Sequence, residues 1–241
     1  MPQVKALLLA GGLGTRLRPL TENTPKCLIP VAGKTMLDYW LDALDAADIG
    51  HALLNTHHLR DQVKDWIDAA NANRDLTVIE AYEPELLGSA GSVTANRTWV
   101  EDGDEIVVIY ADNLSNIDLG AFVSFHRSHS DPMTMALFKT PYPEKCGIAT
   151  LDSDHRVTDF VEKPEYPESD LANAGLYVLD AAAWREIADM GAFDFGFDVL
   201  PAFVGRMRGY THQGYHRDIG THESLAQAEA DAPALFDGAK T

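Results

Sequence analysis

Short apolar runs alternate with amphipathic stretches through the first half of the chain. Lys5 to Ala10 is an almost continuous apolar run that stops at two glycines, as a buried strand does where it enters a loop. From Met36 to Ala47 the apolar positions recur at helical spacing, and His51 to Asn55 again has the pattern of a strand. This part of the chain therefore predicts strand, loop, helix and strand in that order.

The alternation continues to residue 111. Apolar positions between Leu59 and Ala70 predict a helix, Leu76 to Ala81 predicts a strand, and a further helix is expected after Gly91. The run from Glu105 to Ala111 is a strong strand pattern. Such an order of strands and helices predicts a parallel sheet with helices on both faces.

The pattern changes after Phe138, where Pro141 and Pro143 are followed by shorter strand-like runs. These runs cover Gly147 to Leu151, Val157 to Val161 and Gly175 to Leu179. Their length and the turn residues between them favour antiparallel pairing. We expect a final helix from about His222 to Asp231 and a frayed tail from Asp237 to Thr241.

These patterns predict the α/β class. The expected fold is a Rossmann-like, mainly parallel sheet flanked by helices, with a smaller antiparallel insertion. No internal repeat or low-complexity linker interrupts the 241 residues. We therefore expect a single domain over residues 1–241.

The charge of the chain limits its partners. Nineteen Lys and Arg stand against 37 Asp and Glu, which gives a net charge of −18. Such a field repels nucleic acid and anionic lipid, so neither is an expected partner. The apolar run Val4 to Ala10 is too short to span a membrane and has no signal-peptide layout, so a cytoplasmic location is predicted.

Cysteine and histidine indicate neither a disulfide framework nor a zinc site. Cys27 and Cys146 are the two cysteines, and we expect both to be reduced. The nine histidines have no spacing typical of metal ligands.

A glycine-rich loop follows the first strand. Gly11, Gly12 and Gly14 allow backbone amides to approach a phosphate closely, and Arg16 can donate bidentate hydrogen bonds to it. The loop therefore indicates a polyphosphate site, although an ordinary turn between strand and helix has the same glycines. A dinucleotide fingerprint is excluded because Leu17 stands where its third glycine belongs.

Two further motifs resemble parts of known binding sites. Gly33-Lys34-Thr35 is similar to the end of a P-loop, but the required earlier glycine is replaced by Leu28, so we predict a turn before a helix. Asp112 follows an apolar strand, and open α/β sheets bind ligands at this end of their strands. A capping or turn role for Asp112 remains open at this point.

Residues 11–34, GGLGTRLRPLTENTPKCLIPVAGK, resemble the signature of the sugar-1-phosphate nucleotidylyltransferases. These enzymes join a nucleoside triphosphate and a sugar 1-phosphate into a nucleotide sugar and release pyrophosphate, usually with Mg²⁺. The resemblance implies catalytic roles for Arg16, Lys26 and Asp112. It implies nucleotide contacts from Leu9, Ala10, Gly11, Gly12, Gly14, Thr15, Arg16, Lys26, Gly88 and Gly91.

The resemblance extends to a metal site and a sugar site. It implies that Asp112 and Asp218 hold Mg²⁺. The Glu-Lys-Pro element at Glu162 and its neighbours implies contacts to the sugar phosphate from Gly147, Glu162, Lys163 and Asn173. The chain departs from the family pattern at Ala111, where the family has glycine, and at His216, where it has tryptophan.

On this resemblance, residues 1–138 are mainly nucleotide-binding, 139–221 mainly bind the sugar phosphate, and 222–241 form the C-terminal helix and tail. The turn at Leu87 to Gly91 resembles that of guanylyltransferases acting on mannose- or heptose-type 1-phosphates, so GTP is the expected nucleotide. Alternatives are a uridylyl-, thymidylyl- or cytidylyltransferase acting on another phosphorylated acceptor, and a non-catalytic nucleotide-sensing subunit. The residues leave a homo-oligomer open.

Overall fold

The first predicted strand forms β1, Val4–Leu9, in the computed structural model, which describes residues 3–236. Packing divides these residues into two units, each assembled from three separate segments. Unit 1 comprises residues 3–5, 87–109 and 120–213, and unit 2 comprises residues 6–86, 110–119 and 214–236.

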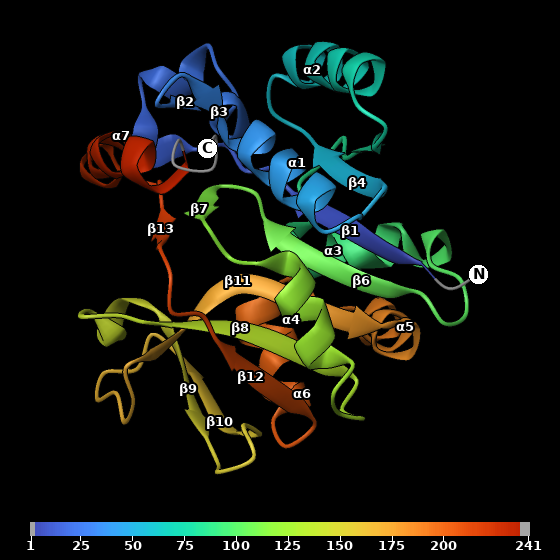
Figure 1. The fold of residues 1–241 in the computed structure, drawn as a ribbon, viewed down its shortest axis with the longest axis vertical. Coiled ribbons are helices and arrows are strands. Elements are labelled where there is room, and N and C mark those ends of the chain that lie inside the picture. Colours follow the sequence, from blue (N-terminus) through green and yellow to red (C-terminus); the bar gives the residue numbers. More distant parts are fainter. Residues whose placement is uncertain (1–2, 237–241) are drawn as a thin grey trace. The chain divides into compact units, whose positions relative to one another are not determined.

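Unit 2 contains the predicted strand and helix alternation. β1 pairs in parallel with β4, His51–Thr56, and β4 pairs in parallel with β5, Thr77–Tyr82. The connecting helices are α1, Met36–Ala46, and α2, Arg60–Asn73 (Figure 1). Parallel neighbours need such crossovers, because a short turn can join only antiparallel strands.

Helix α1 begins where the sequence places a turn. β2, Pro30–Val31, and β3, Lys34–Thr35, form a small hairpin. Gly33 lies in the predicted turn, whereas Lys34 and Thr35 form a short strand before the helix. The Thr35 side chain accepts a hydrogen bond from the Asp38 amide and caps the helix. Trp40 and Leu41 lie on the buried face of α1, as its apolar spacing requires.

The remaining elements of unit 2 come from the beginning, the middle and the end of the chain. β7, Asn113–Ser115, pairs in antiparallel fashion with β13, His216–Asp218. The last helix, α7, covers His222–Phe236. Three short 3-10 helices occupy the segment after β1: η1, Thr15–Leu17; η2, Leu20–Glu22; and η3, Lys26–Leu28.

Unit 1 has the antiparallel character expected after Phe138. Its strands are β6, Glu105–Tyr110, whose last residue belongs to unit 2, β8, Met133–Lys139, β9, Gly147–Leu151, β10, Val157–Glu162, β11, Leu171–Asp180, and β12, Met207–Thr211. β11 is antiparallel to β6, β8 and β9, and β10 is antiparallel to β9. β12, by contrast, is parallel to β8.

The helices of unit 1 include one unusual element. They are α3, Gly88–Ala95, η4, Arg97–Trp99, α4, Leu119–His126, whose first residue belongs to unit 2, η5, Pro143–Lys145, α5, Ala181–Met190, and α6, Leu200–Phe203. Between α5 and α6 the segment Phe195–Val199 forms a π-helix, η6. Such elements are rare and are frequently found at functional sites.

The predicted α/β class is confirmed, with several differences in element length. α3 begins at Gly88 and includes Gly91, β11 begins at Leu171, and α7 continues to Phe236. The predicted frayed tail, residues 237–241, lies outside the described residues.

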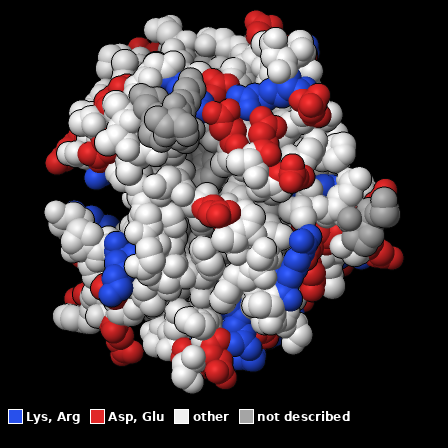
Figure 2. All heavy atoms as spheres, in the orientation of Figure 1, with Lys and Arg blue, Asp and Glu red and all other residues white. Residues whose placement is uncertain are grey.

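Two surface properties bear on the predicted partners. Acidic side chains exceed basic ones on the face shown in Figure 2, in keeping with the net charge. Within residues 3–236 no helix combines the length and apolar character that crossing a membrane requires.

Candidate functional site

The glycine loop after β1 is fixed to the neighbouring strand by Asn55. The Asn55 Oδ1 atom accepts hydrogen bonds from the amides of Ala10, at 2.5 Å, and Gly11, at 3.0 Å. A Cβ atom at Gly11 would lie 3.0 Å from Asn55 Nδ2, so a side chain there would crowd this contact. The sequence pattern gave no prediction for Asn55. The signal that could have identified it is its position as a polar residue at the end of an apolar strand.

Gly14 lies where the glycine loop ends and the 3-10 helix η1, which contains Arg16, begins. Its φ of 61° is left-handed, and a Cβ atom would lie 2.7 Å from Thr21 Cγ2. The Gly14 carbonyl accepts a hydrogen bond from Thr21 Oγ1 at 2.8 Å. The Arg16 side chain is 67% exposed, and its guanidinium lies 3.7 Å from Asp218. Arg16 is thus available to an anion from solvent.

Lys26 joins the two predicted metal carboxylates. Its side chain is only 8% exposed, and its Nζ atom lies 2.5 Å from Asp112 Oδ2 and 3.3 Å from Asp218 Oδ1. A buried ammonium costs free energy unless it is paired, and these two carboxylates supply the pairing. Residues 26, 112 and 218 therefore converge within unit 2.

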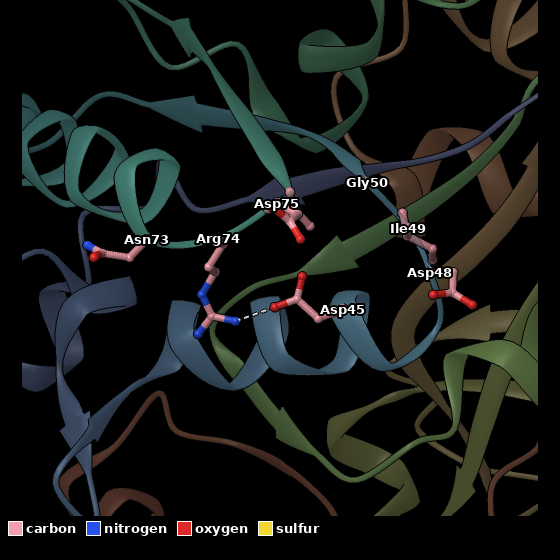
Figure 3. A pocket seen from close by; sticks show the side chains of 8 residues that line it. Asp45, Asp48, Ile49, Gly50, Asn73, Arg74 and Asp75 are labelled. Carbon is pink, nitrogen blue, oxygen red and sulfur yellow. Dashed lines mark hydrogen bonds and ion pairs between the residues drawn. The ribbon is translucent and has the colours of Figure 1, made fainter.

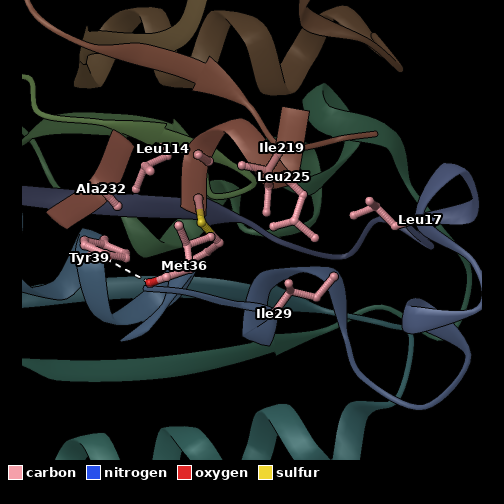
Figure 4. Packing of buried hydrophobic residues seen from close by; sticks show 10 residues of the cluster. Leu17, Ile29, Met36, Tyr39, Leu114, Ile219, Leu225 and Ala232 are labelled. Carbon is pink, nitrogen blue, oxygen red and sulfur yellow. Dashed lines mark hydrogen bonds between the residues drawn. The ribbon is translucent and has the colours of Figure 1, made fainter. Parts of the chain in front are cut away.

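A cluster of buried hydrophobic residues (Figure 4) includes residues that are close in sequence to these charged groups. Leu17 follows Arg16, Ile219 follows Asp218, and Leu114 is two residues after Asp112; all three are buried in the cluster. Arg16, Asp112 and Asp218 therefore each have a residue one or two positions later that is anchored in the core. Because the backbone is already anchored, the charged groups would lose less conformational entropy on binding a ligand.

The chemistry of Asp112 and Asp218 fits a divalent cation. Both present carboxylate oxygens to one cationic position, now formed by the Lys26 ammonium. Mg²⁺ commonly takes one or two protein carboxylates and completes its shell with phosphate oxygens and water. Within residues 3–236 no cluster of three or more His, Cys, Asp or Glu side chains could hold a metal by itself.

The two departures from the family pattern lie beside Asp112 and Asp218. Ala111 is fully buried, and its amide donates to the Leu9 carbonyl at 3.1 Å, so the extra methyl group is accommodated in the core. His216 pairs with Ser115 in the β13–β7 ladder. Cys27, next to Lys26, is buried, and this burial, with a smaller effect of the Asp112 charge, raises the pKa of its thiol to about 12. Cys27 is therefore a protonated core residue at neutral pH.

The predicted base-binding turn lies in unit 1. Gly88 has a φ of 79°, and a Cβ atom there would lie 2.2 Å from the Phe193 carbonyl oxygen. The Ala90 amide donates to this same carbonyl at 3.0 Å. The start of α3 is thus held against the segment that follows α5, and glycine at position 88 is required by both backbone conformation and space.

Glu162 and Gly147 face each other across the β9–β10 pair. A Cβ atom at Gly147 would lie 2.4 Å from Glu162 Oε2 and 2.6 Å from the Phe160 ring. Burial raises the pKa of Glu162, while the nearby Lys163 charge opposes this shift. The arrangement holds a partly desolvated carboxylate ready to accept hydrogen bonds.

Lys163 lies directly after β10 in a strained backbone conformation. Its φ is 51°, and its amide donates to the Cys146 carbonyl at 3.0 Å. Its Nζ atom lies 3.6 Å from Glu162 Oε1. A non-glycine residue in the left-handed region costs free energy and is often found at functional sites.

Asn173 completes the predicted sugar set on β11. Its Nδ2 atom donates to the Tyr177 hydroxyl at 2.8 Å, and its Oδ1 atom accepts from the Gly175 amide at 2.9 Å. The adjacent residue, Ala172, pairs with Ile148 of β9. Asn173 and Gly147 are therefore each adjacent in sequence to one member of the Ala172–Ile148 pair that joins β11 and β9.

The predicted site residues fall into two groups. Unit 2 holds Leu9, Ala10, Gly11, Gly12, Gly14, Thr15, Arg16, Lys26, Asp112 and Asp218, and unit 1 holds Gly88, Gly91, Gly147, Glu162, Lys163 and Asn173. The phosphate loop and the proposed metal ligands are thus together, and so are the proposed sugar contacts.

Unit 2 also has a large acidic pocket of about 700 Å³, shown in Figure 3. Asp45, Asp48 and Asp75 line it, and Arg74 is paired with Asp45 at 2.5 Å. Gly50, another lining residue, immediately precedes β4, so the pocket lies at the amino end of this strand. Ligands of open α/β sheets bind at the carboxyl ends, and the acidic lining does not suit phosphate.

Comparison with known proteins agrees with this geometry. The model of the family described as "Nucleotidyl transferase" matches residues 5–234. The chain belongs to this family. A mannose-1-phosphate guanylyltransferase of Mycobacterium tuberculosis is 34% identical over 233 residues, which are 95% of this chain and 64% of the relative. The sugar-1-phosphate nucleotidylyltransferase resemblance is thereby confirmed at the level of the family.

Other members of the nucleotidyl transferase family differ in the base they are named for. A glucose-1-phosphate adenylyltransferase of Bacillus cytotoxicus is 28% identical over 251 residues, covering 94% of this chain and 67% of the relative. A Bacillus anthracis protein, provisionally called a glucose-1-phosphate thymidylyltransferase and solved with sucrose, matches with a TM-score of 0.86 and 26% identity, over 95% of both chains. The chain spans less than two thirds of the mycobacterial relative.

Glu162→Gln should change how stability depends on pH. Burial raises the pKa of the Glu162 carboxyl in the folded state. At pH values just above the ordinary pKa of a glutamate, the folded state therefore binds more protons than the unfolded state. Stability therefore falls as pH rises through that window, and glutamine should remove this decrease. Urea unfolding at a series of pH values measures the slope, with Glu165→Gln in the following exposed loop as a matched control. Identical slopes for Glu162→Gln and wild type would contradict the buried-carboxylate assignment.

Proposed function

We propose that the protein transfers a nucleoside monophosphate unit from a nucleoside triphosphate to a sugar 1-phosphate, giving a nucleotide sugar and pyrophosphate. The observation that carries this proposal is the Lys26 ammonium held between Asp112 and Asp218, beside the glycine loop and Arg16. Family membership and the named activities of the relatives support it.

GTP is the nucleotide we favour. Leu87 to Gly91 resembles the turn of mannose- and heptose-type guanylyltransferases. The guanylyltransferase relative is also more similar in sequence, at 34% identity, than the adenylyltransferase relative, at 28%. The alternative is uridylyl, thymidylyl or cytidylyl transfer to another phosphorylated acceptor. A non-catalytic nucleotide-sensing subunit is the weaker hypothesis, because Asp112, Asp218 and Lys163 are all retained.

The mechanism follows from the charges of the substrates. A triphosphate and a sugar phosphate are both anions, and the protein itself has a net charge of −18. Arg16 and Lys26 would offset the charge of the triphosphate, and Lys163 that of the sugar phosphate. Arg16 is best suited to the negative charge that moves onto the leaving pyrophosphate, because its guanidinium is exposed and can follow that group.

The proposed displacement is direct and in line. An oxygen of the sugar phosphate attacks the α-phosphorus of the triphosphate, one P–O bond forms, and the bond to pyrophosphate breaks. The attacking oxygen is already ionised at neutral pH, so no general base and no covalent intermediate is required. Positioning and electrostatic stabilisation then supply the rate enhancement.

Asp112 and Asp218 would hold Mg²⁺ in this reaction. When bound, the ion supplies charge neutralisation of the phosphate oxygens and orients them. No third protein ligand would be required, because phosphate oxygens and water commonly supply the other Mg²⁺ ligands in such sites.

The direct test is a matrix of four nucleoside triphosphates against several sugar 1-phosphates, with pyrophosphate release as the readout. We expect the highest kcat/KM with GTP and a hexose 1-phosphate. Efficient turnover with another base would refute the GTP assignment alone. Hydrolysis or binding without any nucleotide sugar would refute the proposed function.

Asp112→Asn should lower kcat by at least ~100-fold, equivalent to about 2.7 kcal/mol of transition-state stabilisation, because it removes a charge from the metal site. Asp218→Asn should behave similarly. The matched control is Asp48→Asn, an exposed residue of the acidic pocket, which should keep the wild-type rate. A near-normal kcat for Asp112→Asn in saturating Mg²⁺ would remove Asp112 from the proposed site.

Lys163→Ala should affect one substrate only. Loss of a charge-assisted contact of ~1.5–3 kcal/mol should raise KM for the sugar 1-phosphate by roughly 10- to 150-fold and leave KM for the triphosphate unchanged. Lys145→Ala, an exposed lysine of the same unit, is the control. If triphosphate affinity collapsed while sugar-phosphate binding survived, the assignment of Lys163 to the sugar phosphate would be wrong.

A further inference from the structure

An exposed aromatic ring lies beside the proposed sugar contacts. Phe197 belongs to the π-helix Phe195–Val199 and is 63% exposed. The ring centroid lies 6.0 Å from Lys163 Nζ, which is within the range of a cation–π contact. A large apolar side chain at such a place contributes little to the core of unit 1, and its position calls for another explanation.

The backbone that carries Phe197 is well fixed. The Phe197 amide donates to Asp194 Oδ1 at 3.1 Å, and the amides of Phe193 and Asp194 both donate to Asp198 Oδ2 at 2.9 Å. Phe195, two residues before Phe197, is fully buried and stacks on Tyr177 with ring centroids 4.9 Å apart. Phe195 thus anchors the segment in the core, and the hydrogen-bonded backbone holds Phe197 at the surface.

Gly196 allows this segment to approach Glu162. A Cβ atom at position 196 would lie 2.9 Å from Glu162 Oε2, so the carboxylate occupies the space of the missing side chain. Glu162 in turn lies 3.6 Å from Lys163 Nζ. A carboxylate, an ammonium and an aromatic ring therefore converge in unit 1, from β10 and from the π-helix.

We propose that Phe197 is a specificity-determining residue that provides an apolar face for the sugar ring of the sugar 1-phosphate. This inference rests on the proposed function. A hexose has polar edges, which Glu162 and Lys163 would bind through the hydroxyls and the phosphate, and faces lined by C–H groups, which need an apolar surface. A rigid aromatic ring offers such a surface at little cost in conformational entropy.

The test compares Phe197→Ala and Phe197→Leu with wild type, using mannose 1-phosphate and glucose 1-phosphate with GTP. For Phe197→Ala we expect KM for the better hexose 1-phosphate to rise by roughly 5- to 20-fold, with KM for GTP changed less than about 2-fold. Phe197→Leu keeps apolar bulk without the ring and should give an intermediate KM. Tyr142→Ala is the matched control, because Tyr142 is 58% exposed and its ring lies 4.6 Å from Lys145 Nζ.

Inorganic phosphate separates the sugar ring from the phosphate group. As a competitive inhibitor against the hexose 1-phosphate, it should have the same inhibition constant for wild type and Phe197→Ala, since it has no ring to contact. An equal rise in both constants would mean that Phe197 acts only by orienting Lys163, and would overturn the inference. An unchanged hexose KM would also overturn it while leaving the proposed function intact. Absence of nucleotide-sugar formation by wild type with all four nucleoside triphosphates would instead refute the proposed function.

Discussion

The buried Lys26 ammonium is the interaction on which the rest of the candidate site depends. In a chain with a net charge of −18, Asp112 and Asp218 would repel each other if no cation lay between them. Lys26 compensates both from a buried position, while the two carboxylates remain partly exposed to solvent. The pairing joins residues separated by 86 and 192 positions in the sequence, and so ties the start, middle and end of the chain within unit 2.

Polar contacts of this kind need a rigid support, and unit 2 supplies it through apolar residues that are close in sequence to the charged ones. Leu17, Leu114 and Ile219 pack in one cluster and fix the backbone next to Arg16, Asp112 and Asp218. In unit 1 the support is different in kind. There the missing side chains of Gly147 and Gly196 leave room for the Glu162 carboxylate.

The regular parts of the fold could be predicted from the sequence because the pattern of apolar residues matches their geometry. The strand at Lys5, the helix from Met36 and the strand at Glu105 have clear periodicity, and all three are present close to the expected bounds. The π-helix Phe195–Val199 had no such signal, because its shape is set by hydrogen bonds that the Asp194 and Asp198 carboxylates accept from backbone amides. β11 is longer than expected because Leu171 to Asn173 form ladder contacts with β8 and β9 that no local pattern specifies.

The candidate site was accessible from the sequence to the extent that it lies in contiguous motifs. The glycine loop and the Glu-Lys-Pro element are short and distinctive, whereas Asn55 and Phe197 act through contacts made only after folding. The convergence of Lys26 with Asp112 and Asp218 was implied by family resemblance, since their separation in sequence gives no local signal.

The left-handed backbone of Lys163 has a consequence for attempts to make the protein more robust. Asparagine or glycine would adopt this conformation at lower cost, so a heat-tolerance screen that ignores catalysis would favour replacing the lysine. A library selected for folding alone would then be enriched in well-folded variants that lack the proposed contact between Lys163 and the sugar phosphate. Selection at this position needs a catalytic readout from the first round.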